Sequence, residues 1–167
     1  MQESEGIRNV APMALVRILV DGYSLLHAWP ELAAGCARFS EAARDELLRT
    51  LTQYQDASGT PVTVVFDGRG QSGGPRKVTP RHEVEVLYST DGRTADDLIE
   101  RAAHRLSVYG EVLVVTNDRA ERETVNFVGG MVSSCFNFIC TVESTLESFR
   151  SQLDRRNQGE QKRFRSR

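Results

Sequence analysis

The sequence predicts an α/β fold in which helices cover both faces of a mainly parallel β-sheet. Runs rich in branched apolar residues predict strands at 16–20, 62–66 and 112–115. An alternating segment at 83–88, expected at a sheet edge, and a short run at 131–133 add two more. Segments with helical spacing of apolar residues lie between them. Because strands that alternate with helices build a parallel sheet between helical layers, we expect a three-layer α/β/α domain.

The helices are predicted by apolar spacing together with signals at their ends. Segments 41–57, 94–107, 118–127 and the region around 142–153 are expected to be helical. Ser40 is a suitable N-cap for the first of these, and Ser58-Gly59 ends it. Thr94 begins the second, where Asp97 completes a capping-box-like pattern. The segment from Gly22 to Pro30 is expected to be a loop.

The chain of 167 residues is long enough for one domain with a sizeable core. We expect a flexible N-terminal extension at 1–13, the folded domain at 14–153 and a basic C-terminal tail at 154–167. Residues 150–167 carry seven basic and two acidic side chains, a net charge of +5, which leaves −7 for residues 1–149. An acidic body with a basic end fits a metal-binding enzyme that holds a polyanion with a flexible arm. A disordered, solvated terminus is the equally ranked alternative.

The protein is expected to be soluble and cytoplasmic. Its three cysteines, Cys36, Cys135 and Cys140, lack metal-ligand spacing and cannot all pair within the chain, which favours a reducing compartment. No apolar run approaches the roughly 20 residues needed to span a bilayer. The acidic and polar start of the chain does not resemble a secretory signal.

Acidic side chains stand at the predicted ends of three strands and at the start of one helix. They are Asp21 after Ile-Leu-Val, Asp67 after Val-Val-Phe, Asp118 after Val-Val-Thr-Asn, and the pair Asp96-Asp97. In an open α/β sheet, ligands bind in the crevice beyond the carboxyl ends of the strands. Carboxylates gathered there repel one another, and a bound divalent cation relieves the repulsion. The pattern therefore predicts a Mg²⁺ or Mn²⁺ site and phosphate-ester chemistry.

Each of these acids also has an ordinary structural explanation. Asp-Gly is a common turn pair, which would account for Asp21 and Asp67. Asp96 and Asp97 would suit the positive end of a helix dipole, and Asp118 would serve as an N-cap. We favour the functional interpretation because all four acidic segments are expected at one edge of the sheet.

The run from Asp21 to Leu32, Asp-Gly-Tyr-Ser-Leu-Leu-His-Ala-Trp-Pro-Glu-Leu, resembles the opening motif of YacP-like NYN-domain proteins, a branch of the PIN-like nucleases. Further similar segments follow in order: Ala43-Arg44-Asp45, Tyr54-Gln55, Val64–Asp67, Val84–Ser89, Thr94–Asp97 and Val114–Asp118. The resemblance covers about residues 15–150. Its specific parts are the Trp-Pro-Glu-Leu run and the Thr-Ala-Asp segment.

The resemblance implies a PIN-like α/β/α fold and a metal-dependent endoribonuclease. It places catalytic positions at Asp21, Asp67, Asp96 and Asp118, with Asp97 as a nearby helper, and gives the same carboxylates to one or two Mg²⁺ or Mn²⁺ ions. In such sites the metal lowers the pKa of a bound water, and the resulting hydroxide attacks phosphorus in line. Aspartate is suitable because Mg²⁺ prefers oxygen ligands.

Ser24 is a departure from the family pattern, which usually has Asn at this position. An Asn amide donates a hydrogen bond and also accepts one, whereas Ser has a single hydroxyl of shorter reach. Full activity, altered activity and loss of activity are all compatible with this change. We favour retained activity and count Ser24 among the catalytic candidates.

Basic residues around the loop after Asp67 are candidates for RNA contact, with a solvated loop as the alternative. They are Arg69, Arg76, Lys77 and Arg81. Tyr23 and Trp29 have rings that can stack on bases, although Trp29 is expected to pack against the sheet edge. His27 is not expected to be a ligand.

The leading hypothesis is a divalent-metal-dependent endoribonuclease that acts on RNA in mRNA decay or RNA processing. The alternative is a catalytically weak PIN-like module that binds RNA or the ribosome, motivated by Ser24 and the basic tail. A phosphatase or receiver-like domain ranks third. Asp21 lacks the second acid two residues on that phosphatases of this type have, and no lysine follows Val128 before Lys162. No membrane partner is expected.

Overall fold

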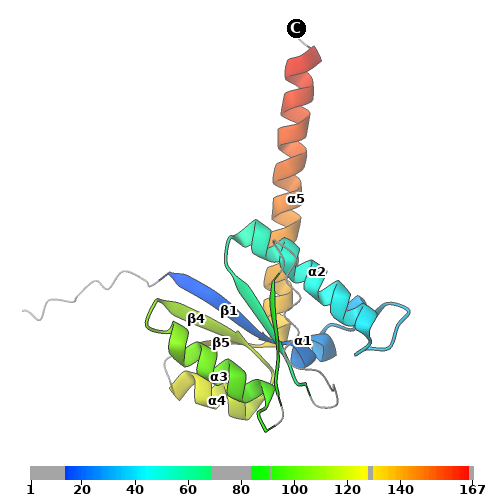
Figure 1. Cartoon of the computed structure of the whole chain (residues 1–167). Coiled ribbons are helices and arrows are strands. Elements are labelled where there is room, and N and C mark those ends of the chain that lie inside the picture. Colours follow the sequence, from blue (N-terminus) through cyan, green and yellow to red (C-terminus); the bar gives the residue numbers. More distant parts are fainter. Residues whose placement is uncertain (1–13, 69–83, 91, 128–129, 166–167) are drawn as a thin grey trace, which may run out of the picture.

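The fold is built on a five-stranded, entirely parallel sheet (Figure 1). The computed structural model describes residues 14–68, 84–90, 92–127 and 130–165. The strands are β1 (Leu15–Asp21), β2 (Val62–Phe66), β3 (Glu85–Tyr88), β4 (Glu111–Val115) and β5 (Met131–Ser133). Their order across the sheet is β3-β2-β1-β4-β5, so β1 is central and β3 lies at an edge, as expected.

Helices cover both faces of this sheet, which confirms the predicted three-layer arrangement. They are α1 (Gly22–Ala28), α2 (Glu41–Ser58), α3 (Ala95–Leu106), α4 (Arg119–Phe127) and α5 (Cys135–Arg165), with a short 3-10 helix, η1, at Pro30–Ala33. α1, α2 and α5 pack on one face, and α3 and α4 pack on the other (Figure 1).

The ends of α2 and α3 follow their sequence signals. Ser40 Oγ accepts a hydrogen bond from the Ala43 N–H at 3.2 Å, and Gly59 ends α2 in the left-handed conformation with a φ of 72°. At the start of α3, the Asp97 N–H donates to Thr94 Oγ1 at 3.2 Å, and the Thr94 N–H donates to Asp97 Oδ2 at 2.9 Å. This reciprocal capping box satisfies backbone N–H groups that a helix start leaves unpaired.

The loop predicted after the first strand is wrong, because residues 22–28 form α1. Asp21 caps this helix through a hydrogen bond from the Ser24 N–H. Gly22 is buried, and a Cβ at this position would overlap the ring of Phe66. The glycine therefore lets the helix start directly against the sheet. This is a tertiary constraint, and the sequence alone presents the same Asp-Gly pair as a turn signal.

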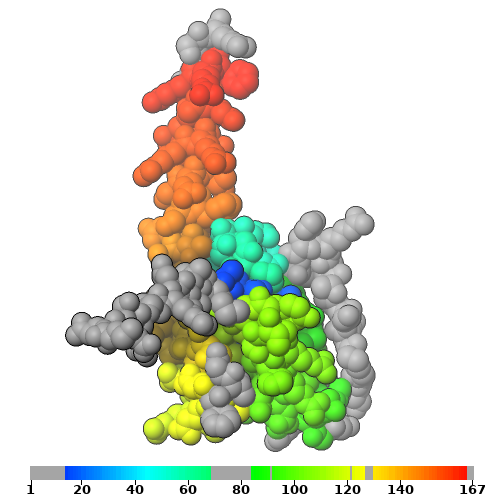
Figure 2. Space-filling view, turned by 90° about the vertical axis from the view of Figure 1, so that its left-hand side faces the viewer, coloured from blue at the N-terminus to red at the C-terminus, as the bar shows by residue number. Residues whose placement is uncertain are grey.

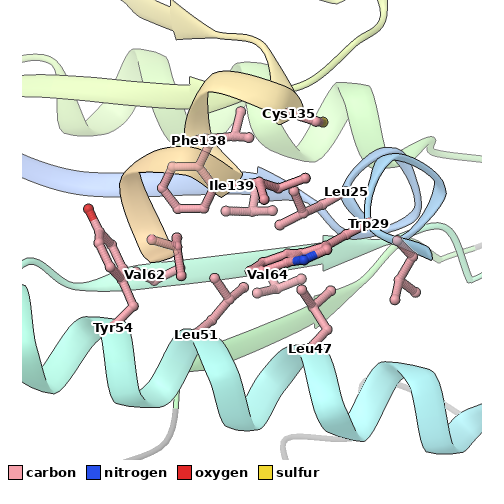
Figure 3. Packing of buried hydrophobic residues seen from close by; sticks show 14 of the residues in the cluster. Leu25, Trp29, Leu47, Leu51, Tyr54, Val62, Val64, Cys135, Phe138 and Ile139 are labelled. Atoms are coloured by element: carbon pink, nitrogen blue, oxygen red, sulfur yellow. The ribbon is translucent and has the colours of Figure 1, made fainter. Parts of the chain in front are cut away.

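The larger core cluster lies between the sheet and the layer of α1, α2 and α5 (Figure 3). Side chains from these elements meet there, among them Leu47, Leu51, Tyr54, Val62, Val64, Phe138 and Ile139. The rings of Tyr54 and Phe138 pack edge to face with centroids 5.5 Å apart. Trp29 is only 5% exposed and belongs to the same cluster, which confirms that it is a packing residue.

α5 is longer than expected and extends away from the rest of the domain (Figures 1 and 2). Its 31 residues span about 46 Å at the helical rise of 1.5 Å per residue. All described side chains after Leu146 are exposed. The described part of the basic tail is therefore helical, where a flexible or disordered segment was expected. Despite the length of α5, no helix in the described part of the chain combines the length and apolar character needed to cross a membrane.

Candidate active site at the carboxyl edge of the sheet

The carboxyl ends of all five strands lie at one edge of the sheet, because every strand pairing is parallel. From β1 the chain moves through α1 and α2 to β2 on one side. From β3 it returns through α3 to β4 on the other side. The strand order thus reverses between β1 and β4, where Val20 pairs with Val115. Such a reversal point is where ligands bind in open α/β sheets.

Asp21 is the carboxylate at this reversal point. The Ser24 N–H donates to its Oδ1 at 3.3 Å, and the Ser24 hydroxyl donates to its Oδ2 at 2.7 Å. One residue in the first turn of α1 thus orients both oxygens. An ionised carboxylate has about four lone-pair positions, so these two hydrogen bonds leave room for further partners. Ser24, where the family resemblance leads us to expect asparagine, contacts the candidate carboxylate directly.

Asp67 follows β2 and is held by Ser89, which follows β3. The Ser89 hydroxyl donates to Asp67 Oδ1 at 2.9 Å, and Ser89 Oγ accepts from the Gly68 N–H at 2.8 Å. Ser89 is 6% exposed, so the hydroxyl at the centre of this link is shielded from water, whereas Asp67 and Gly68 are half-buried. A Cβ on residue 68 would clash with the Ser89 carbonyl oxygen, which explains the glycine. The ends of β2 and β3 are therefore tied together around the second candidate carboxylate.

Asp96 and Asp97 lie in the first turn of α3, and both side chains are exposed. This turn lies toward the same edge, because α3 follows β3 along the chain. The hydrogen bond from the Thr94 N–H is the main cause that lowers the pKa of the Asp97 carboxyl below its ordinary value. Asp97 is thus committed to the capping box, and Asp96 is the acid of the pair that the cap does not use.

Asp118 lies just beyond β4, where its Oδ1 accepts from the Ala120 N–H at 2.8 Å at the start of α4. Its own N–H donates to Thr116 Oγ1 at 3.1 Å. The preceding side chain serves a different helix, because Asn117 Oδ1 accepts from the Cys135 N–H at 3.0 Å at the start of α5. The segment after β4 is therefore fastened to the starts of two helices.

The predicted acids are found toward one edge, but they do not form a complete metal cage. Among the described residues, no three or more His, Cys, Asp or Glu side chains are grouped so that they could hold a metal ion. Backbone N–H groups at the starts of three helices donate hydrogen bonds to Asp21, Asp97 and Asp118. These contacts relieve part of the mutual repulsion of the carboxylates, which the sequence analysis expected a bound cation to relieve. The donor set still fits Mg²⁺ in its chemistry. Mg²⁺ usually binds through one or two carboxylates, with waters and substrate phosphates as its other ligands.

The other sequence candidates are distributed differently. Arg69, Arg76, Lys77 and Arg81 lie outside the described residues. The Tyr23 ring packs edge-on against Phe66 and Phe39, with centroids 5.2 and 5.8 Å apart, so it contributes to packing beside the site. His27 is exposed and stacks on Phe39, and its Nδ1 lies 3.3 Å from the guanidinium of Arg38.

Sequence reasoning missed Ser89 as a partner of Asp67 and Asn117 as an acceptor for the Cys135 N–H at the start of α5. Ser89 lies 22 residues from Asp67 along the chain, and only the pairing of β2 with β3 brings them together. A usable signal was present, because Ser89 is a polar residue that directly follows a strand. The aspartates were selected because they follow strands, and the same criterion applied to hydroxyl side chains finds Ser89.

The structure is a parallel sheet between helical layers with acidic side chains at its carboxyl edge. Together with the family match that follows, these features place the protein in the class with a PIN-like nuclease fold. The sequence profile of the YacP-like NYN domain matches residues 18–167, which include the exposed part of α5. The chain belongs to the YacP-like NYN domain family.

Relatives from Bacillus subtilis agree with this membership. The uncharacterized protein YacP of strain 168 is 35% identical over 128 residues, which are 76% of this chain and 75% of that protein. The crystal structure of Rae1 (YacP) superimposes with a TM-score of 0.73 at 30% identity, over 89% of this chain and 84% of that one. A point mutant of the same protein gives a TM-score of 0.66 at 29% identity, over 87% and 82% of the two chains.

Proposed function

We propose that this protein is a divalent-metal-dependent endoribonuclease that hydrolyses RNA phosphodiesters in mRNA decay or RNA processing. The observation that carries the proposal is the position of Asp21 at the end of the central strand, with both carboxylate oxygens oriented by Ser24. Membership of a family with a nuclease-type fold supports the same reaction class. Cys36, Cys135 and Cys140 form no disulfide, which supports a cytoplasmic setting, where thiols stay reduced.

In this proposal Asp21 would hold Mg²⁺ or Mn²⁺ together with Asp67 and Asp118, which follow the neighbouring strands. Asp96 would contribute from the start of α3, with Asp97 as a helper. A bound ion would supply a hydroxide nucleophile near neutral pH and stabilise charge on the leaving oxygen. The all-oxygen character of this set suits hard cations.

The contribution of the chain itself is to orient these oxygens. Ser24 directs both oxygens of Asp21, and Ser89 directs Oδ1 of Asp67. Hydrogen bonds of this kind commonly fix the direction of metal-binding carboxylates, and their loss weakens metal affinity or activity. Ser24 therefore keeps the donor function for which the family usually employs asparagine. This supports an active rather than a decayed site.

The test is cleavage of a labelled single-stranded RNA with Mn²⁺ or Mg²⁺ by the wild type, Asp21→Asn and Asp96→Asn. We expect both variants to lose activity by at least about 100-fold, because each removes a charge on which the ion and its bound water depend. Asn is as good an N-cap as Asp, so Asp21→Asn should stay folded. Asp56→Asn, on the exposed end of α2, is the matched control. Equal cleavage by all four proteins would exclude the assignment.

A second candidate function is a catalytically weak PIN-like module that binds RNA or the ribosome. The observation that favours it is the exposed end of α5, which extends beyond the domain (Figure 2). Its basic side chains after Leu146 are Arg150, Arg155, Arg156, Lys162 and Arg163, against the acids Glu147, Asp154 and Glu160. A helix with excess positive charge suits a polyanionic surface.

The two functions differ in which variants affect association with RNA or ribosomes. If the protein is a binding module, removal of residues 155–167 should weaken its association with RNA or ribosomes and make that association less dependent on salt. Asp21→Asn should leave association unchanged. No RNA cleavage should be measurable. Metal-dependent cleavage that Asp21→Asn abolishes would instead establish the nuclease. Unchanged affinity after the deletion would count against the module.

A further inference from the structure

The side of α4 that faces away from the sheet carries a polar stripe. Arg119, Arg122, Glu123 and Asn126 recur at the spacing that places residues on one side of a helix, while Val125 is buried in the core. The four polar side chains line an open hollow of about 200 Å³. Figure 2 shows α4, in yellow, on the surface beside α3, in green.

This stripe adjoins the candidate active site through the chain itself. α4 begins with Arg119, the residue directly after Asp118. Asp118 in turn follows β4, one of the two strands at the reversal point of the sheet. A nucleic-acid strand with a phosphate at the carboxylates would pass the first turns of α4 if it left the site on this side.

The two arginines of the stripe, Arg119 and Arg122, are both exposed. Within the described ranges neither guanidinium forms an ion pair. Arg17 pairs with Glu85 at 3.4 Å, and Arg49 pairs with Glu46 at 2.6 Å. A guanidinium presents a planar fork of donors that matches a phosphate group, so two of them one turn apart suit a polyphosphate backbone.

We propose that Arg119 and Arg122 form a phosphate-binding subsite for the RNA strand beside the candidate carboxylates. The choice of RNA as the ligand rests on the proposed function. The subsite holds the strand by its backbone, so it contributes affinity without reading sequence. Glu123 lines the same hollow, and its negative charge repels phosphates. Removing the arginine charges should therefore weaken RNA binding, and removing the Glu123 charge should strengthen it.

The test measures binding of a labelled single-stranded RNA to the full chain by fluorescence anisotropy in the presence of a chelator, so that metal-dependent cleavage does not interfere. Arg119→Gln/Arg122→Gln should weaken binding about tenfold. The plot of log affinity against log salt should become less steep by about 1.4, which is about 0.7 per lost phosphate contact. Glu123→Gln should strengthen binding. Arg44→Gln/Arg49→Gln on α2, in the opposite layer, removes the same charge and should change affinity little.

In the cleavage assay with Mn²⁺, the double variant on α4 should raise KM and leave kcat within about twofold, as expected for a subsite that binds substrate and transition state alike. The subsite would be overturned if the double variant bound RNA as tightly as the wild type, if the α2 control weakened binding equally, or if the wild type bound no RNA. A mononucleotide that displaces RNA as well as an oligonucleotide does would also overturn it. Arginine-dependent binding without any RNA cleavage would refute the proposed function and leave this interface standing.

Discussion

Ser24 holds both oxygens of Asp21, since its hydroxyl donates to Oδ2 at 2.7 Å and its backbone N–H donates to Oδ1 at 3.3 Å. Hydrogen bonds to an ionised acceptor are shorter and roughly twice as strong as those between neutral groups. Because Asp21 ends the central strand and is the N-cap of α1, the pair fixes a carboxylate where strand and helix meet. The residue that departs from the family pattern is therefore an oriented donor to the leading site candidate.

Ser24→Ala should lower Mn²⁺ affinity or RNA cleavage by about 10- to 100-fold, because Oδ2 of Asp21 loses its donor while the backbone donor to Oδ1 remains. Ser24→Asn should keep activity, since the amide supplies a donor again. Ser107→Ala removes a hydroxyl at the far end of α3 and is the control. Wild-type cleavage by Ser24→Ala would show that the orienting bond is dispensable.

Ser89→Ala should affect both stability and the site. The half-buried Gly68 N–H would lose its acceptor and Asp67 would lose a donor, which costs about 1–3 kcal/mol of unfolding free energy. We also expect Mn²⁺ affinity to fall by about 10- to 100-fold. Chemical denaturation and metal titration measure the two effects separately. A stability loss with unchanged metal affinity would leave Ser89 a purely structural residue.

Alanine substitutions of two helical glycines should change stability in opposite directions. Gly22→Ala places a Cβ into the Phe66 ring and should cost about 1–3 kcal/mol of unfolding free energy. In Gly159→Ala the new Cβ meets nothing within 4 Å on the exposed end of α5. This substitution should stabilise the end of the helix by up to about 1 kcal/mol and so increase its helicity. Denaturation and far-ultraviolet circular dichroism measure these changes. Destabilisation by both would argue against an exposed α5 end.

Asp97→Asn should change how stability depends on acidity. The Thr94 N–H holds the pKa of the Asp97 carboxyl below its ordinary value of 3.8, so the folded state favours the charged form. The stabilisation from this carboxylate is fully present above about pH 4 and is lost as the pH falls through the lowered folded pKa. The difference in Tm between wild type and variant should therefore shrink at acid pH. A difference that is constant from neutral to acid pH would contradict this role.

The strands and the two best-defined helices are predictable from the sequence because their determinants are local. β2 is a run of β-branched and aromatic residues, and α2 and α3 carry both their periodic stripes and their caps at Ser40 and Thr94. α1 is not predictable in this way, since Gly22 starts a helix only where it packs on Phe66, which lies far along the chain. The end of α5 is missed because its apolar stripe stops at Leu153, and residues 154–165 carry no periodic apolar pattern.

The candidate site is predictable in position and only partly in its connections. Strand-ending aspartates indicate the carboxyl edge, since the rule for parallel sheets needs only the strand assignments. The link from Ser89 to Asp67 depends on strand pairing between segments 22 residues apart, and the link from Asn117 to α5 depends on how that helix docks. Such contacts are set by tertiary structure, so they cannot be predicted from the spacing of the residues along the chain.

We propose that the carboxyl edge of this sheet binds a divalent ion through Asp21 and its neighbours. The most direct measurement is a crystal structure of the protein soaked with Mn²⁺, with an anomalous difference map. We predict a peak within coordination distance of an Asp21 oxygen, shared with Asp67, Asp96 or Asp118, and its loss in Asp21→Asn crystals treated alike. A map of well-ordered wild-type crystals with no peak at this edge, or with peaks only elsewhere, would contradict the account.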